Sequence, residues 1–128
     1  MAIATRFQEL RAWQNSIELA MRIFELSKRF PVEERYSLTD QVRRSTRSVA
    51  ANISEAWRKR RYEGAFISKL NDAETEVAES QTWIEIARRC GYLDDPTASE
   101  LMAEAEEILS QLALMIRDAN RWCEGFLR

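Results

Sequence analysis

Residues 62–91, YEGAFISKLNDAETEVAESQTWIEIARRCG, place apolar or small residues at alternating spacings of three and four. The residues that share this spacing are Phe66, Leu70, Ala73, Val77, Ser80, Ile84 and Ala87. They fall on one face of an α-helix for about three heptads. Gly91 can adopt the left-handed backbone conformation that closes a helix. The stretch therefore predicts a long amphipathic helix over about residues 62–90.

Three further amphipathic helices are predicted over about residues 5–30, 38–60 and 98–126. Pro31 ends the first of them, because proline disfavours helical geometry in the residue before it. The other two begin at sequences typical of capping boxes, Ser37-Leu-Thr-Asp40 and Thr97-Ala-Ser-Glu100. Four helices with short connections favour an all-α, antiparallel up-down-up-down four-helix bundle. At 128 residues, positions 1–128 are expected to form this single domain.

The first and last predicted helices each carry two apolar stripes, which is more than one bundle contact needs. In residues 5–30, one stripe runs from Leu10 through Ile17 to Phe24, and the other runs from Leu19 to Phe30. An exposed apolar stripe on a monomer would promote aggregation. We therefore expect self-association; the alternative is that the wide faces fill a thick monomeric core.

The composition indicates a folded protein, with 45% hydrophobic and 31% charged residues. No apolar run approaches the roughly 20 residues that cross a bilayer, and the first residues do not resemble a secretory signal. We expect a cytoplasmic protein that does not enter a membrane. No small-molecule substrate is evident from the sequence.

Charge is divided unequally along the chain. Residues 1–61 hold 13 Lys and Arg against 7 Asp and Glu, whereas residues 62–128 hold 6 against 14. This asymmetry predicts either one basic and one acidic surface, or two halves that attract each other within the chain or between subunits.

Several kinds of catalytic site are excluded by the residue types present. The chain has no histidine, which excludes His-based acid–base catalysis and Glu-x-x-His di-iron sites. Asp72, Glu76 and Glu79 share one helix face, and we interpret them as a solvated surface rather than a cation site. Cys90 and Cys123 should lie at opposite ends of the bundle, too far apart for a disulfide. The sequence thus predicts no enzyme activity, metal or cofactor.

The second helix carries the candidate binding residues. Arg44, Arg47, Arg58 and Arg61 form a stripe about 25 Å long, and Arg43, Lys59 and Arg60 flank it. A basic stripe beside aromatic residues is typical of a surface that binds RNA or DNA phosphates. The alternative is that the acidic second half or a neighbouring subunit neutralises the stripe.

Two polar residues interrupt the buried face of the same helix. Asn52 and Glu55 lie among Val49, Ile53 and Ala56. An unpaired buried polar group costs about 1–3 kcal/mol, so both are expected to be hydrogen-bonded. We interpret the pair as a structural polar latch that fixes helix or subunit register.

Nearly the whole chain resembles the "four helix bundle protein" family that was first noted in intervening sequences of bacterial 23S rRNA genes. The most telling segments are FQELRAWQNSIELAMRIFELSKRFPVEERYSLTDQVRRSTRSVAANISEAW and LNDAETEVAESQTWIEIARRCGYL. The motifs that carry the resemblance are Trp13-Gln14, Phe30-Pro31-Val32-Glu33-Glu34, Tyr36/Leu38/Gln41 and Asn52-Ile53-Ser54-Glu55.

The resemblance implies a four-helix bundle that assembles as a ring-like homopentamer and has no known enzymatic activity. One branch of that family comprises strongly basic accessory proteins of diversity-generating retroelements, which bind a reverse transcriptase and its RNA template. This chain differs from that branch in its acidic pI of about 5.4. It also has Ala56 where the family usually has Gly.

These observations predict a non-enzymatic oligomeric scaffold. Its expected partners are further copies of itself, and RNA or a nucleoprotein such as a reverse transcriptase is the candidate ligand of the basic surface. The alternative is a protein–protein interaction module without a nucleic-acid role, in which charge asymmetry drives self-assembly.

Overall fold

The computed structural model describes residues 4–127, and side chains as far as Glu124. Within that range the chain is all-α. Its elements are η1 (Phe7–Glu9), α1 (Arg11–Ser27), η2 (Val32–Glu34), α2 (Leu38–Arg58), α3 (Glu63–Arg89), α4 (Asp95–Arg117) and α5 (Ala119–Leu127). The four long helices, α1–α4, pack as a bundle, as the sequence predicts.

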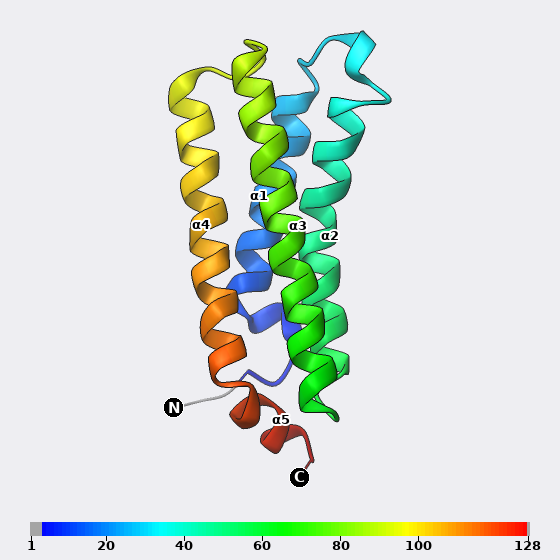
Figure 1. Ribbon diagram of the computed structural model, residues 1–128, viewed down its shortest axis with the longest axis vertical. Helices are drawn as coiled ribbons and strands as arrows, with labels where there is room; N and C mark the ends of the chain where they lie inside the picture. The colour runs from blue at the N-terminus through cyan, green and yellow to red at the C-terminus, as the bar shows by residue number, and fades with distance from the viewer. Residues whose placement is uncertain (1–3, 128) are drawn as a thin grey trace.

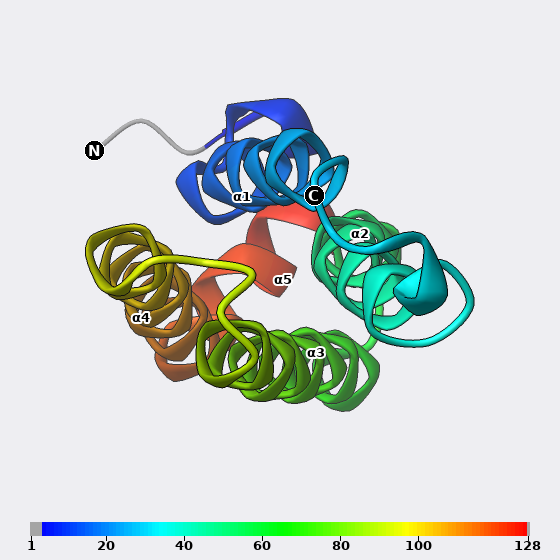
Figure 2. The ribbon, with the colours of Figure 1, turned by 90° about the horizontal axis from the view of Figure 1, so that it is seen from above.

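Successive long helices run in opposite directions and surround one core (Figures 1 and 2). Each contacts the next, and α1 also contacts α4. The connection that holds η2 and the α3–α4 turn lie at one end, while the α2–α3 turn and α5 lie at the other (Figure 1). The outward face of α2 is therefore bordered by a different connection at each end.

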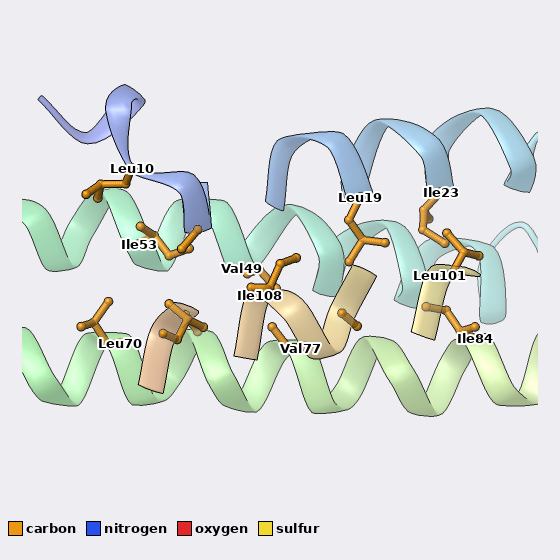
Figure 3. Close-up of a cluster of buried hydrophobic side chains, with 14 of the residues drawn as sticks. Leu10, Leu19, Ile23, Val49, Ile53, Leu70, Val77, Ile84, Leu101 and Ile108 are labelled. Carbon is orange, nitrogen blue, oxygen red and sulfur yellow. The ribbon is translucent and has the colours of Figure 1, made fainter. Parts of the chain in front are cut away.

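The core is built from the periodic residues of all four helices. Ile23 of α1 lies beside Leu101 of α4 and Ile84 of α3, and Leu19 lies nearer Val49 of α2 and Ile108 of α4, while Ile53 lies close to Leu10 (Figure 3). All seven residues of the predicted α3 stripe are buried. The inner face of α2 is also buried, including Ser45, which accepts a hydrogen bond from Ser80 of α3 at 2.8 Å. Small residues at this contact let α2 and α3 approach closely.

The first helix is shorter than the sequence predicts. It begins at Arg11 rather than near residue 5, because Leu10 is extended and residues 7–9 form a separate 3₁₀ turn. The Glu9 carboxylate accepts bonds from the Thr5 amide and hydroxyl, which fixes this turn. α1 ends at Ser27, yet Phe30 beyond it is still buried. Apolar periodicity therefore continues through residues that are not helical.

The two apolar stripes of α1 have different environments. Leu19 and Ile23 are 1% exposed and face the core, whereas Ile17 is 37% and Met21 54% exposed. Polar pairs with α4 occupy another side of α1, where Asn15 bonds to Gln111 at 3.1 Å. The stripe through Ile17 is thus buried at Leu10 and exposed at Ile17 and Met21.

The predicted capping box at the start of α2 is wrong. Ser37 is the N-cap, but its side chain makes no cap bond. Glu34 of η2 takes that role: its carboxylate accepts bonds from the Leu38 amide at 3.3 Å and the Ser37 hydroxyl at 2.6 Å. At the other end α2 stops at Arg58, with Lys59 as C-cap. Residues 59–60 of the predicted helix therefore lie in the α2–α3 turn, together with Arg61.

The last predicted helix, 98–126, is two helices. α4 begins at Asp95, because the Asp94 side chain caps the helix by accepting a hydrogen bond from the Thr97 amide at 2.8 Å. The predicted capping box at Thr97 and Glu100 does not form. α4 ends at Arg117, and α5 turns beneath the bundle (Figure 1). This turn brings Trp122 to within 6.2 Å of Trp57 between ring centroids. Packing across the base of the bundle accounts for the break.

The two cysteines are free, as the sequence predicts. Cys123 is buried, and that burial raises the pKa of its thiol. Cys90 is exposed at the end of α3. None of the described helices is both long and apolar enough to cross a membrane.

Candidate partner-binding surface

The α2 helix has its core face on one side and a strongly basic face on the other. Arg44, Arg47 and Arg58 are exposed on the outward face, whereas Arg43 is half-buried toward α1. About 16 Å of helix separates Arg47 from Arg58, at 1.5 Å per residue. The seven predicted basic residues therefore form two groups, Arg43–Arg47 on the helix and Arg58–Arg61 at its end.

Arg43 is held in place by α1. Its Nε donates to the Ser27 hydroxyl at 2.7 Å, and its terminal nitrogen donates to the Phe24 carbonyl at 3.5 Å. The guanidinium also lies over the Phe24 ring, 4.9 Å from the centroid. These contacts fix the side chain, so less conformational entropy is lost when it binds a further group.

Three cations gather around that one ring. Besides Arg43, Lys28 lies 4.8 Å and Arg47 5.8 Å from the Phe24 centroid. The negative face of an aromatic ring attracts cations, which partly offsets the repulsion among them. Lys28 also pairs with Glu25 at 3.1 Å, but Arg43 and Arg47 have no ion pair with any residue in the described part of the chain.

The acidic second half neutralises this group only in part. Arg44 pairs with Glu79 of α3 at 3.1 Å and bonds to Gln41 at 3.2 Å. Glu79 also accepts a bond from Trp83. The predicted neutralisation by α3 thus reaches Arg44 but neither Arg43 nor Arg47.

Two hollows flank Arg43. The larger, about 450 Å³, lies over the outward face of α2 and is lined by Arg35, Thr39, Asp40, Arg43, Arg44, Arg47, Ser48 and Ala51. The smaller, about 260 Å³, reaches the end of α1 and is lined by Ser27, Lys28, Phe30, Pro31, Val32, Arg35, Thr39 and Arg43. Sequence reasoning missed Arg35, because its place beside α2 depends on how the connection folds back.

The second basic group lies at the α2–α3 turn. Arg60 stacks on Trp57, 3.4 Å from the ring centroid, and donates to the Trp57 carbonyl at 2.8 Å. Burial lowers the pKa of Arg60. Arg58 and Lys59 are exposed and make no ion pair within residues 4–127. Arg60 therefore has a packing role here, whereas Arg58, Lys59 and Arg61 are the exposed cations of this group.

Asn52 and Glu55 meet a residue that the sequence did not single out. Lys69 of α3 donates to the Asn52 side-chain carbonyl at 3.0 Å and pairs with Glu55 at 3.3 Å. The Asn52 amide donates back to the Ser48 carbonyl at 2.9 Å. Asn52 is 8% exposed, as predicted for the buried face, whereas the Glu55 side chain is 55% exposed and does not belong to that face. Lys69 thus joins both members of the predicted latch to α3.

The carboxylates of α3 have unequal surroundings. Asp72 is exposed, but Glu76 is half-buried, and one of its oxygens has no hydrogen-bond partner. Burial raises the pKa of Glu76, and nearby Glu79 raises it further. Within the described residues, no group of three or more histidine, cysteine or acidic side chains could hold a metal ion.

The chain is similar to a family model and to solved structures. A family model described as 23S rRNA-intervening sequence protein matches residues 8–113. A crystal structure of a protein with unknown function from the S23 ribosomal protein family of Bacteroides thetaiotaomicron is similar, with 31% sequence identity and a TM-score of 0.74. That similarity covers 83% of this chain and 95% of the other. No curated protein matches the chain. The residues matched by the family model include all of α2 and both hollows, but not α5.

Proposed function

The chain belongs to the 23S rRNA-intervening sequence protein family, and from that premise we propose that it is a non-enzymatic adaptor that binds the phosphate backbone of RNA through α2. The observation that carries this proposal is the larger hollow, whose lining includes Arg35, Arg43, Arg44 and Arg47. Arginine is well suited to phosphate because its planar group offers several N–H donors together with a permanent charge.

The available cations favour binding over internal packing. Of the three arginines in the Arg43–Arg47 group, only Arg44 has an ion pair among the described residues. Arg58 and Lys59 extend the basic face toward the other end of α2. Each phosphate that these cations neutralise releases condensed counterions, so binding should weaken steeply as salt rises. Contacts of this kind position a nucleic acid without reading its sequence.

The test is a charge reversal on the accessible face of α2. Arg47→Glu combined with Arg58→Glu is expected to reduce affinity for a structured RNA at least tenfold at about 50 mM salt, and wild-type affinity should fall markedly by about 200 mM. Fluorescence anisotropy with a labelled RNA measures both effects.

The matched control reverses two exposed arginines elsewhere, Arg11 at the start of α1 and Arg89 at the end of α3. Arg11→Glu with Arg89→Glu changes the net charge equally and should retain most of the affinity. Equal losses in the two double variants, or no RNA binding by the wild-type protein at low salt, would refute a specific role for α2.

A second candidate function is a protein-interaction module that self-assembles and has no nucleic-acid role. Its support is the exposure of large apolar side chains, Ile17 and Met21 on α1 and Leu114 on α4. Exposed apolar side chains that lie close together, as Ile17 and Met21 do one turn apart on α1, commonly mark contacts with other proteins. Self-association without any affinity for RNA would favour this candidate over the first.

A further inference from the structure

We propose that the two hollows beside Arg43 form one site for two adjacent phosphate groups. Such groups occur in a diphosphate and in two consecutive phosphates of an RNA strand. This inference rests on the proposed function, because it takes the basic face of α2 as an anion-binding surface, and it names the chemical group that the surface takes. It also locates binding in the Arg43–Arg47 group rather than near Arg58.

The two hollows share a wall. Arg35, Thr39 and Arg43 line both of them. Each hollow then has a cation of its own: Arg47 lines the larger one and Lys28 the smaller one. A ligand with two linked phosphates could place one in each hollow and contact Arg43 from both sides. A single phosphate could occupy only one hollow and would contact Arg43 from one side only.

Donors for such a ligand are already present in the shared wall. Arg43 uses two of its five N–H groups on Ser27 and Phe24, which leaves three for a ligand. Thr39 is 8% exposed, and its hydroxyl makes no hydrogen bond with any described residue. By contrast, the Thr46 hydroxyl on the same helix donates to the Val42 carbonyl at 2.8 Å. A hydroxyl left without a partner on the wall of a hollow can donate to a phosphate oxygen.

The charges of the site match a doubly negative ligand. Arg35, Arg43 and Arg47 have no ion pair within residues 4–127, and Asp40 is the only described acidic residue that lines either hollow. The three unpaired arginines and Asp40 together give the site a net charge of about +2. Two consecutive phosphodiesters carry two negative charges, and a diphosphate carries at least as many near neutral pH. Asp40 opposes binding of either ligand.

The probe for this site is inorganic pyrophosphate, compared with orthophosphate at equal ionic strength. Isothermal titration calorimetry of the full chain should show that pyrophosphate binds at least tenfold more tightly than orthophosphate. Arg43→Gln and, separately, Arg47→Gln should each weaken pyrophosphate binding about tenfold or more, because each removes a charge-assisted contact. Arg58→Gln, on the same helix but outside the hollows, should change it less than twofold.

Asp40→Asn gives a test with the opposite sign. Removing this carboxylate should strengthen pyrophosphate binding severalfold, whereas Glu107→Gln, an equal charge change at an exposed site on α4, should not. Asp40→Asn tests the site independently of Arg43→Gln, which can loosen the contact between α1 and α2. Circular dichroism melts identify such loosening.

The outcomes separate this inference from the proposed function. The two-phosphate site is refuted if pyrophosphate does not bind, binds no better than orthophosphate, or binds equally to the wild-type, Arg47→Gln and Asp40→Asn proteins. Pyrophosphate binding without any binding of a short single-stranded RNA would uphold the site but refute RNA as the ligand. RNA binding that Arg47→Gln weakens, and that pyrophosphate displaces, would support both.

Discussion

At the scale of single residues, Lys69 joins α2 to α3 through polar contacts with Asn52 and Glu55. Its ammonium group lies 3.0 Å from the Asn52 carbonyl oxygen, 3.3 Å from Glu55 and 3.8 Å from Asp72. The Lys69 side chain is 23% exposed, so its stem packs between helices while its charge reaches several acceptors. The register of α2 against α3 determines which acceptors it reaches.

We predict that Lys69→Met destabilises the protein by about 1–3 kcal/mol, because it leaves the buried Asn52 carbonyl oxygen without its partner. Urea denaturation followed by circular dichroism measures this difference. Adding Asn52→Leu should recover part of the loss, since replacing both partners by apolar groups can be nearly neutral.

The control for Lys69 is Lys59→Met, which removes the same charge from an exposed residue at the end of α2. It should change the free energy of unfolding by less than about 0.5 kcal/mol. If Lys69→Met proves equally mild, the latch does not depend on this lysine. Assembly of Asn52→Leu that matches the wild type would count against the wider prediction that the latch fixes subunit register.

The burial of Asn52 follows from the sequence, whereas the identity of its partner does not. Asn52 falls beside Val49, Ile53 and Ala56 on the apolar face of α2, and helical periodicity alone places it there. Lys69 comes from another helix, at a position decided by the relative shift of α2 and α3. The sequence pattern of one helix contains no information about that shift.

At the scale of secondary-structure elements, Glu34 joins the start of α2 to the turn between α3 and α4. One carboxylate oxygen accepts bonds from Ser37 and the Leu38 amide, and the other accepts a bond from the Tyr92 hydroxyl at 3.0 Å. The hydroxyls of Ser37 and Tyr92 hold the pKa of Glu34 below its ordinary value. The same bond raises the pKa of Tyr92 to about 12.

We predict that Glu34→Gln lowers the melting temperature at pH 7 and that this effect shrinks in acid. The folded-state pKa of Glu34 lies below the ordinary value of 4.5, so its carboxylate stabilises the fold above about pH 4.5. That contribution is lost as the pH falls through the folded-state pKa, where wild type and variant become alike. Melting curves followed by circular dichroism between pH 7 and pH 3 test this.

Glu33→Gln is the matched control for Glu34, since it removes an adjacent, exposed carboxylate. It should leave the melting temperature nearly unchanged at pH 7. The prediction for Glu34 is contradicted if its variant melts like the wild type at pH 7, or if the difference is the same at pH 3 as at pH 7.

The boundaries of the elements were harder to predict than their existence. Periodicity predicted four long helices correctly because each buries one face over many turns. The caps depend on single side chains, and a carboxylate three or four residues upstream can replace the expected one. Glu34 replaces the expected box at Ser37, and Asp94 replaces the one at Thr97. The break at Asp118 likewise depends on Trp122 packing against Trp57, a contact between residues far apart in the sequence.

At the scale of the whole molecule, the charge asymmetry of the sequence is only partly cancelled within one chain. Arg22 pairs with Glu100 and Glu104, and Arg44 pairs with Glu79. Glu106 and Glu107 on α4 are exposed and make no ion pair with a described residue. Arg35, Arg43 and Arg47, which line the basic hollows, likewise make no ion pair with a described residue. The hollows could not be predicted from the stripe on α2, because Arg35 and Lys28 reach them only through the fold of the connection.

We predict that the protein self-associates and that added salt weakens the assembly. Sedimentation velocity should show an oligomer at about 0.1 M NaCl that dissociates progressively toward about 1 M, because the Debye length falls from about 10 Å to 3 Å.

Met21→Glu should also shift the protein toward monomer, since Met21 is 54% exposed on the apolar stripe of α1. Val32→Glu, which alters a 77% exposed side chain outside that stripe, should not. A monomer at every concentration and salt level would show that the stripe through Ile17 and Met21 is not a self-association surface. The ring-like homopentamer implied by the family resemblance would then be wrong for this chain.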